Sequence, residues 1–124
     1  TLRRERVNVG GLIHALRPQL EAEAARLGAS LDVDAAPGLI MFGDRVRLQE
    51  ALATLLGDVV RRSARDARIR IAAESEDGHA VITIDGAAAL TTEAEVVFAR
   101  RIVSAQGGRI ESDANRVVIR LPRA

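Results

Sequence analysis

The residues with the clearest chemical potential lie in one stretch, Val81–Glu95. Its first residues alternate between apolar and polar side chains, which predicts a strand, and Asp85 stands at the end of that strand. The small residues 86–89 follow, and a helix is expected from Thr92, because Thr92 and Glu95 have the spacing of a capping box. Many nucleotide-binding folds hold their ligand at such a junction of strand and helix. This junction is therefore the first candidate for a site.

Composition excludes several other kinds of site. The chain has no cysteine, which rules out disulfides, thiolate catalysis and cysteine-based metal sites. All 18 basic residues are arginine, so mechanisms that need a lysine are absent as well. The two histidines, His14 and His79, are far apart in sequence, which disfavours a transition-metal site. Nucleic-acid binding is also disfavoured, because 17 acids nearly balance the arginines and Phe42 and Phe98 are the only aromatic residues.

The length and composition predict one soluble domain. A chain of 124 residues with 48% hydrophobic and 28% charged residues is ordinary for a globular protein. No apolar run approaches the roughly 20 residues of a membrane span, and no secretory segment opens the chain, which favours the cytoplasm. Because the sequence begins with Thr1, we expect a piece of a longer protein, with residues 1–6 as a linker or the end of a preceding helix and residues 7–124 as the domain.

The remaining patterns predict three helices and seven strands. Apolar residues at spacings of three and four predict helices over residues 12–27, 45–63 and 92–106, the second capped by Asp44. Short runs of alternating or apolar residues predict strands at 7–9, 30–34, 39–42, 69–73, 80–85, 109–112 and 116–121. The sequence Asp77-Gly78 predicts a tight hairpin between two of these strands.

This order of elements indicates the α+β class. Each helix is followed by a pair of strands, so the helices are expected to cover one face of a mixed sheet of five or more strands. The predicted architecture is a two-layer α/β sandwich whose other sheet face is more solvated.

Three runs resemble the catalytic ATP-binding domain of sensor histidine kinases, which has the Bergerat fold. Residues 43–52 are similar to the start of the family's asparagine-box helix, residues 100–110 to its last helix and following strand, and residues 118–122 to its final strand. The order and spacing of these runs also agree with the family. The resemblance covers Val7 to Pro122 and implies bacterial two-component signalling with ATP and Mg²⁺ as cofactors.

The resemblance also assigns site residues. Asp58 stands where the family has a helix asparagine that binds Mg²⁺, and a carboxylate is also a hard oxygen ligand. Arg61 stands where a lysine contacts phosphate, and Arg62 where an aromatic side chain packs on adenine. Asp85, followed by Gly86, stands where an acid accepts a hydrogen bond from the adenine amino group.

Other family features are missing. The first glycine box reads Asp85-Gly86-Ala87-Ala88-Ala89, with alanine at both required glycines, and a Cβ hinders close approach to a ligand. Residues 93–96 hold the place of the second glycine box, and their two glutamates would repel a triphosphate. Only a few residues separate Ala89 from Thr92, so the family's long nucleotide lid has no room.

Each candidate also has a purely structural interpretation. Asp85 could be a turn or cap residue, and Asp58 a partly exposed helix acid. The pairs Arg61–Arg62 and Arg100–Arg101 could hold a phosphate or an acidic partner, or simply form solvated helix faces. The segment around His14 is similar to the phosphoacceptor segment of the same kinases, but a partly exposed helix histidine is the expected outcome.

The leading hypothesis is a degenerate histidine-kinase ATPase-like domain with little or no ATP binding and no catalytic residue of its own. It would act as a regulatory or docking module beside a dimerisation and phosphoacceptor helical domain, with a response-regulator receiver domain as a possible partner and no nucleic-acid or membrane contact. One alternative is an active kinase domain in which Asp58 binds Mg²⁺, Asp85 binds adenine and Arg61 contacts phosphate. The other is the scaffold domain of a histidine phosphotransferase that binds response regulators.

Overall fold

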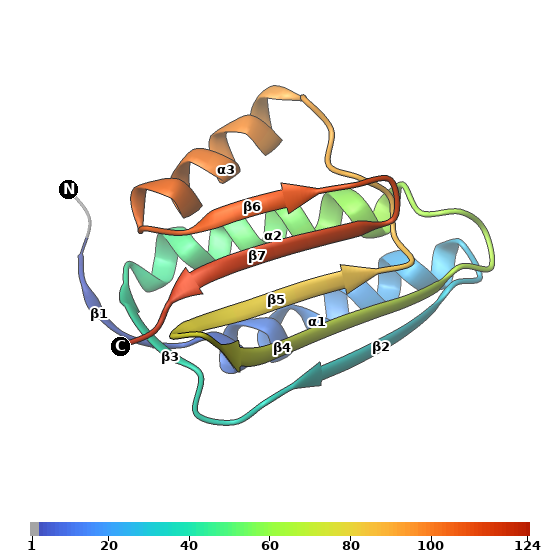
Figure 1. Ribbon diagram of the computed structural model, residues 1–124. Coiled ribbons are helices and arrows are strands. Elements are labelled where there is room, and N and C mark those ends of the chain that lie inside the picture. The colour runs from blue at the N-terminus through green and yellow to red at the C-terminus, as the bar shows by residue number, and fades with distance from the viewer. Residues whose placement is uncertain (1–2) are drawn as a thin grey trace.

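The computed structural model describes residues 3–124 and has the predicted order of elements (Figure 1). The strands are β1 Glu5–Asn8, β2 Ser30–Ala35, β3 Ile40–Gly43, β4 Arg68–Glu76, β5 His79–Asp85, β6 Arg109–Ser112 and β7 Arg116–Pro122. The helices are α1 Val9–Arg26, α2 Arg45–Arg61 and α3 Ala94–Ala105. No helix within residues 3–124 combines the length and apolarity that a membrane crossing requires.

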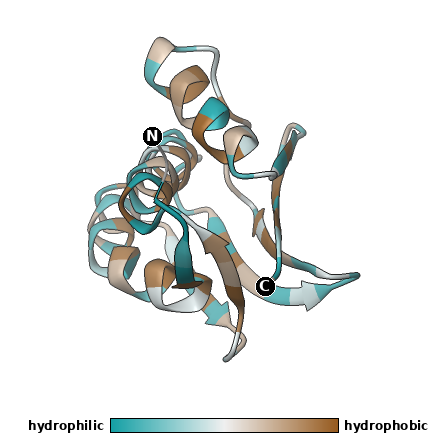
Figure 2. Ribbon diagram, turned by 90° about the vertical axis from the view of Figure 1, so that its left-hand side faces the viewer, coloured by the Kyte–Doolittle hydropathy of each residue, from teal (hydrophilic) through white to brown (hydrophobic). Residues whose placement is uncertain are grey.

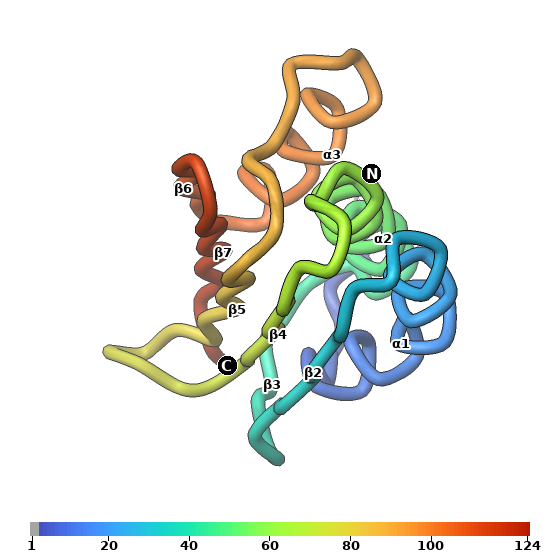
Figure 3. Tube along the Cα trace, turned by 90° about the vertical axis from the view of Figure 1, so that its right-hand side faces the viewer, coloured from blue at the N-terminus to red at the C-terminus, as the bar shows by residue number. Residues whose placement is uncertain are grey.

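The main sheet is mixed and has five strands in the order β2-β4-β5-β7-β6. Strand β2 runs parallel to β4, and the other neighbours are antiparallel. Strands β1 and β3 form a separate antiparallel pair. Figure 3 shows all three helices on the same side of the main sheet. The predicted fold class, a two-layer sandwich with three helices on one face of a mixed sheet, is therefore confirmed.

The core lies between the helices and the sheet. Alternate residues of the central strands, such as Ile82 and Ile119, are fully buried and face the apolar side of α2, where Leu52 and Leu56 are equally buried. Helix α2 packs against α1 on one side and α3 on the other. Figure 2 shows hydrophobic residues concentrated in the central strands and in helix turns. The strand residues between them point to the other face of the sheet, which carries most of its charged side chains.

Helix α1 begins earlier than predicted. It starts at Val9 rather than near residue 12, because the Asn8 side chain accepts a hydrogen bond of 3.0 Å from the Gly11 N–H and caps the helix. Strand β1 is shifted in the same direction, so Glu5 and Arg6, predicted to be linker, pair with β3. The first two residues of the predicted linker lie outside the described part of the chain.

Helix α3 begins later than predicted, and the expected capping box of Thr92 and Glu95 is wrong. The N-cap is Glu93, which makes no side-chain capping hydrogen bond, and the helix starts at Ala94. The chain remains extended at Glu93, with φ −62° and ψ 150°. Two contacts hold it there: Thr91 Oγ1 accepts from the Glu93 N–H at 3.5 Å, and the Thr91 N–H points to Asp58 at 3.4 Å.

Asp44 is the N-cap of α2, as predicted, and it also joins distant segments. Its Oδ1 accepts from the Arg47 N–H and its Oδ2 from the Arg3 N–H, both at 3.1 Å. Its own N–H donates to Oε1 of the buried Gln106 at 2.8 Å, just past the end of α3. The backbone N–H groups of Arg47 and then Arg3 hold the pKa of the Asp44 carboxyl below its ordinary value.

Candidate functional site

Asp58 is buried and paired. Only 2% of the residue is exposed, so the interpretation of Asp58 as a partly exposed helix acid is wrong. Arg62, one helical turn later, donates from Nε to Oδ1 at 3.2 Å and from Nη2 to Oδ2 at 2.7 Å. Both carboxylate oxygens therefore face one guanidinium, which is the strongest geometry available to an acid–arginine pair.

The connection between β5 and α3, residues 86–93, lies against this pair. Arg62 Nη2 also donates to the Ala89 carbonyl, and the Thr91 N–H donates to Asp58 Oδ2 at 3.4 Å. Further along, the Leu90 N–H donates to Ser112 Oγ at 3.0 Å. Arg62 is therefore not part of a purely solvated helix face, because it ties the end of α2 to this connection.

Gly86 begins the connection in a position that excludes any side chain. Its φ is +81°, and a Cβ built on it would lie 2.0 Å from the Arg68 carbonyl oxygen of β4. Its N–H donates to the Asn115 carbonyl at 3.1 Å. The glycine thus permits close approach of the chain's own backbone. Within residues 3–124, the non-glycine residues with positive φ are Asp66 and Asp77, so the alanines at 87–89 have ordinary backbone angles.

Asp85 lies on the opposite face of the sheet from the helices. The residues of β5 that face the core are Ala80, Ile82 and Ile84, and Asp85 falls on the other side by alternation. Its carboxylate accepts from Arg116 of β7, with distances of 2.6 Å to Nε and 3.2 Å to Nη2. The hydrogen bond to Asp85, and then its charge, raise the pKa of the Arg116 guanidinium.

The predicted site residues do not converge. Asp58 faces the connection beside α3, Asp85 faces the outer side of the sheet, and Gly86 has no side chain to offer. Arg61 is exposed and lines a hollow of about 260 Å³ at the end of α1, together with Arg65 and other charged residues. Neither Asp58 nor Arg62 lines any of five surface pockets over residues 3–124.

The sequence contained signals for both acid pairs. Asp58 and Arg62 are four residues apart on a helix, a spacing at which opposite charges meet. Asp85 has the same alternation as the outward-facing Thr83, two residues earlier, and not that of the buried Ile84. His14 lies exposed on α1, in agreement with its structural interpretation as a helix histidine.

The chain was compared with known proteins at the level of sequence and of structure. No family model matches it, and no curated protein is similar to it in sequence. The mycobacterial sensor histidine kinase MprB is similar in structure, with a TM-score of 0.84 and 16% identity over 98% of each chain. The Acinetobacter baumannii histidine kinase AdeS matches with a TM-score of 0.77 and 14% identity over 99% of this chain and 68% of that one.

A third similar structure is full-length ShkA in complex with AMPPNP. It has a TM-score of 0.79 and 16% identity, and the match covers all of this chain but only 32% of ShkA. At such low identity the comparisons establish the arrangement of the backbone. The chain therefore has the fold of the catalytic domains of sensor histidine kinases.

Proposed function

We propose that this chain is a degenerate ATPase-like domain of a two-component signalling protein, with little or no ATP binding and a regulatory or docking role. The observation that carries the proposal is the set of contacts that Asp58 already makes within the chain. Both of its oxygens are engaged by the Arg62 guanidinium, and one also receives the Thr91 N–H. A positive charge of the chain itself thus occupies the place where Asp58 would meet a metal ion.

These contacts do not fit a Mg²⁺ ion at Asp58. Mg²⁺ requires near-octahedral oxygen ligands at close range, and it repels a guanidinium at the same carboxylate. Displacing Arg62 would also break its hydrogen bond to the Ala89 carbonyl, which links α2 to the β5–α3 connection. Breaking these contacts would therefore offset much of the free energy gained by binding the ion.

The surroundings of Asp58 are equally unsuited to a nucleotide. The eight residues 86–93 are the whole connection between β5 and α3, and four of their backbone groups are tied to the rest of the domain. The α3 start carries Glu93 and Glu95, both exposed, whereas a triphosphate is favoured by uncompensated N–H groups or cations at a helix start. The acid of β5, Asp85, faces the outer side of the sheet, where it pairs with Arg116, and so does not reach the helix side.

Calorimetric titration of the 124-residue chain with ATP and Mg²⁺ tests the proposal. We expect no heat of binding at nucleotide concentrations up to about 1 mM, because Asp58 is already paired with Arg62 and the start of α3 carries two glutamates. A thermal-shift series with ATP, ADP and AMPPNP should likewise leave the midpoint unchanged. Micromolar binding in either measurement would contradict the proposal.

Two variants show what such a contradiction would mean. If binding were found and Asp85→Asn abolished it, the alternative of an active domain with an atypical pocket would be supported. Arg62→Ala is the matched comparison, because it removes the cation from Asp58 and leaves Asp85 unchanged. ATP binding that appears only in Arg62→Ala would support the proposal, since Arg62 would then be the group that excludes the ligand.

The proposed role places the domain in a longer signalling protein. The match covers 68% of the AdeS chain and 32% of the ShkA chain, so both structures extend beyond the region that is similar to this chain. We expect a dimerisation and phosphoacceptor helical domain in the same protein, and the domain would influence that partner through contacts instead of phosphoryl transfer.

A further inference from the structure

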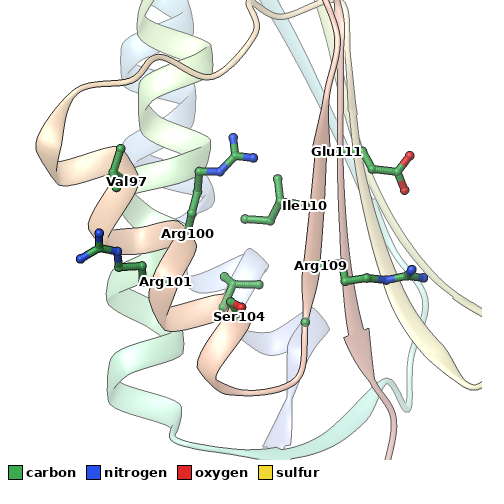
Figure 4. Close-up of a pocket in the computed structure, with 9 residues that line it drawn as sticks. Val97, Arg100, Arg101, Ser104, Arg109, Ile110 and Glu111 are labelled. Carbon is green, nitrogen blue, oxygen red and sulfur yellow. The ribbon is translucent and has the colours of Figure 1, made fainter.

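A groove of about 570 Å³ separates α3 from β6. Its lining residues are Val97, Arg100, Arg101, Val103, Ser104, Gly108, Arg109, Ile110 and Glu111. Figure 4 shows Ile110 pointing from β6 toward α3, with the Arg100 side chain between the two elements and Arg101 and Arg109 directed to either side. The volume lies in the range that accommodates small molecules or several peptide side chains.

One wall of the groove is a free sheet edge. Strand β6 is the last strand in the sheet order and pairs only with β7. The Asp113 N–H bonds to the Arg116 carbonyl, and hydrogen-bonded pairs alternate along antiparallel strands, so Arg109 and Glu111 also bond to β7. The backbone N–H and C=O of Ile110 therefore point away from β7, toward the free edge, where another strand could bind them.

Within the described part of the chain, the arginines at this groove lack the acidic partners that about half of the other arginines have. Eight arginines elsewhere lie within 4.0 Å of an acidic side chain. Arg100, Arg101 and Arg109 have no such partner among residues 3–124. Glu111 is the only acid in the lining, and it is already paired with Arg120. The groove therefore presents uncompensated positive charge beside exposed apolar surface.

We infer that β6 and α3 form a docking groove for an acidic, extended segment of a partner protein. The segment adds as a strand to β6 through the backbone of Ile110. Its apolar side chains enter the groove between Val97 and Ile110. The carboxylates that alternate with them point to the other face of the sheet, where they meet Arg109. The inference rests on the proposed docking role and specifies the chemistry of the partner.

A synthetic peptide provides the test. A fluorescent peptide of about eight alternating Val and Glu residues is long enough to cover β6. We expect saturable binding to the 124-residue chain, with the largest amide NMR shifts at Ile110, Ser112 and Arg100. N-methylation of the peptide amides on the edge that faces β6, or replacement of its Glu by Lys, should weaken binding by about tenfold or more.

Two matched variants separate the groove from the overall charge of the chain. Arg109→Glu should weaken peptide binding about tenfold, whereas Arg65→Glu, which changes an exposed arginine in the loop between α2 and β4, should change it less than about twofold. Circular dichroism of both variants checks that they fold.

Three results would overturn the inference. They are no saturable binding at about 1 mM peptide, equal losses in the two arginine variants, or dimers of the chain that pair through β6. Failure here is distinguishable from failure of the proposed function, because nucleotide heat is measured without peptide. A chain that bound ATP could still dock the peptide, and a chain that bound neither would refute only this groove.

Discussion

Two acid–arginine pairs lie on opposite sides of the same sheet, and they differ mainly in their exposure. Asp58 and Arg62 meet within α2, and 4% of the Asp58 side chain is exposed. Asp85 and Arg116 meet across β5 and β7, where 38% of the Asp85 side chain is exposed. Both pairs have two nitrogen–oxygen contacts. The comparison shows that similar geometry can serve different ends: the buried pair ties the β5–α3 connection to α2, whereas the exposed pair lies on the solvated face of the sheet.

Because the two pairs differ in their exposure to water, they should contribute differently to stability. An exposed pair is screened and easily replaced by hydration, so its net contribution to stability is small. The Asp58 carboxylate has lost most of its hydration, so removal of Arg62 leaves a buried charge without compensation. Single substitutions in the Asp58–Arg62 pair should therefore lower the free energy of unfolding strongly, and single substitutions in the Asp85–Arg116 pair only weakly.

The largest expected effect is at Gly86, where the chain passes from the Asp85 face to the Asp58 side. Gly86→Ala should lower the free energy of unfolding by about 4 kcal/mol. Alanine is strained in the left-handed backbone conformation of residue 86, and its Cβ would lie 2.0 Å from the Arg68 carbonyl oxygen, so β4 would have to move. Urea unfolding followed by circular dichroism measures this loss. Gly38→Ala is the control, since φ is +74° but no atom lies within 4 Å, and about 1 kcal/mol is expected. Equal losses would contradict the role assigned to the close contact.

The buried pair itself gives the next largest effect. Arg62→Ala should cost about 3 kcal/mol in unfolding free energy, the lower end for a broken buried pair, because 36% of the Arg62 side chain is exposed. The double variant Asp58→Leu with Arg62→Leu should recover most of that loss, since no unpaired charge remains. Urea unfolding measures both. A loss below about 1 kcal/mol for Arg62→Ala would show that water reaches Asp58 as freely as it reaches Asp85.

A third acid, Asp44, is stabilised mainly by backbone N–H groups and only weakly by an arginine side chain. Its pKa is held below the ordinary 3.8, so the native state binds this proton less readily than the unfolded chain. The stabilisation is present above about pH 4 and is lost as the pH falls through the lowered folded value. The difference in urea midpoint between wild type and Asp44→Asn should therefore shrink from pH 6 to pH 3. An unchanged difference would contradict this assignment.

The smallest effect is expected at the exposed pair. Arg116→Ala should leave the urea midpoint unchanged within error at about 0.15 M salt, because screening and hydration replace the contact. Repetition at low salt should reveal at most a minor decrease. A loss as large as that of Arg62→Ala would break the contrast between the two sides of the sheet.

Local signals explain how much of the fold could be predicted. The hairpin at Asp77-Gly78 was predicted from its sequence, and both residues have positive φ, as a type I′ turn requires. Asp44 was predicted as a helix cap because its neighbours begin an apolar helical pattern. Gly28 and Gly107, with φ of +65° and +83°, follow the ends of α1 and α3, where a glycine commonly ends a helix. Such features depend only on residues close in sequence.

The errors arose where tertiary contacts prevailed over local pattern. Thr92 and Glu95 have the spacing of a capping box, yet Thr91 is held by Asp58, 33 residues earlier, and the helix starts later. Arg62 was interpreted as a replaced aromatic or a solvated charge, although its spacing from Asp58 allowed a pair. Whether that pair would be buried depended on the connection folding over it, which no local pattern specified.

The Asp44 junction has a mechanical consequence. One residue binds the backbone of Arg3 at the chain's entry, the first turn of α2 and Gln106 after α3. A pull or twist applied at Arg3 would therefore be transmitted through Asp44 to the start of α2 and the end of α3 without first bending the sheet.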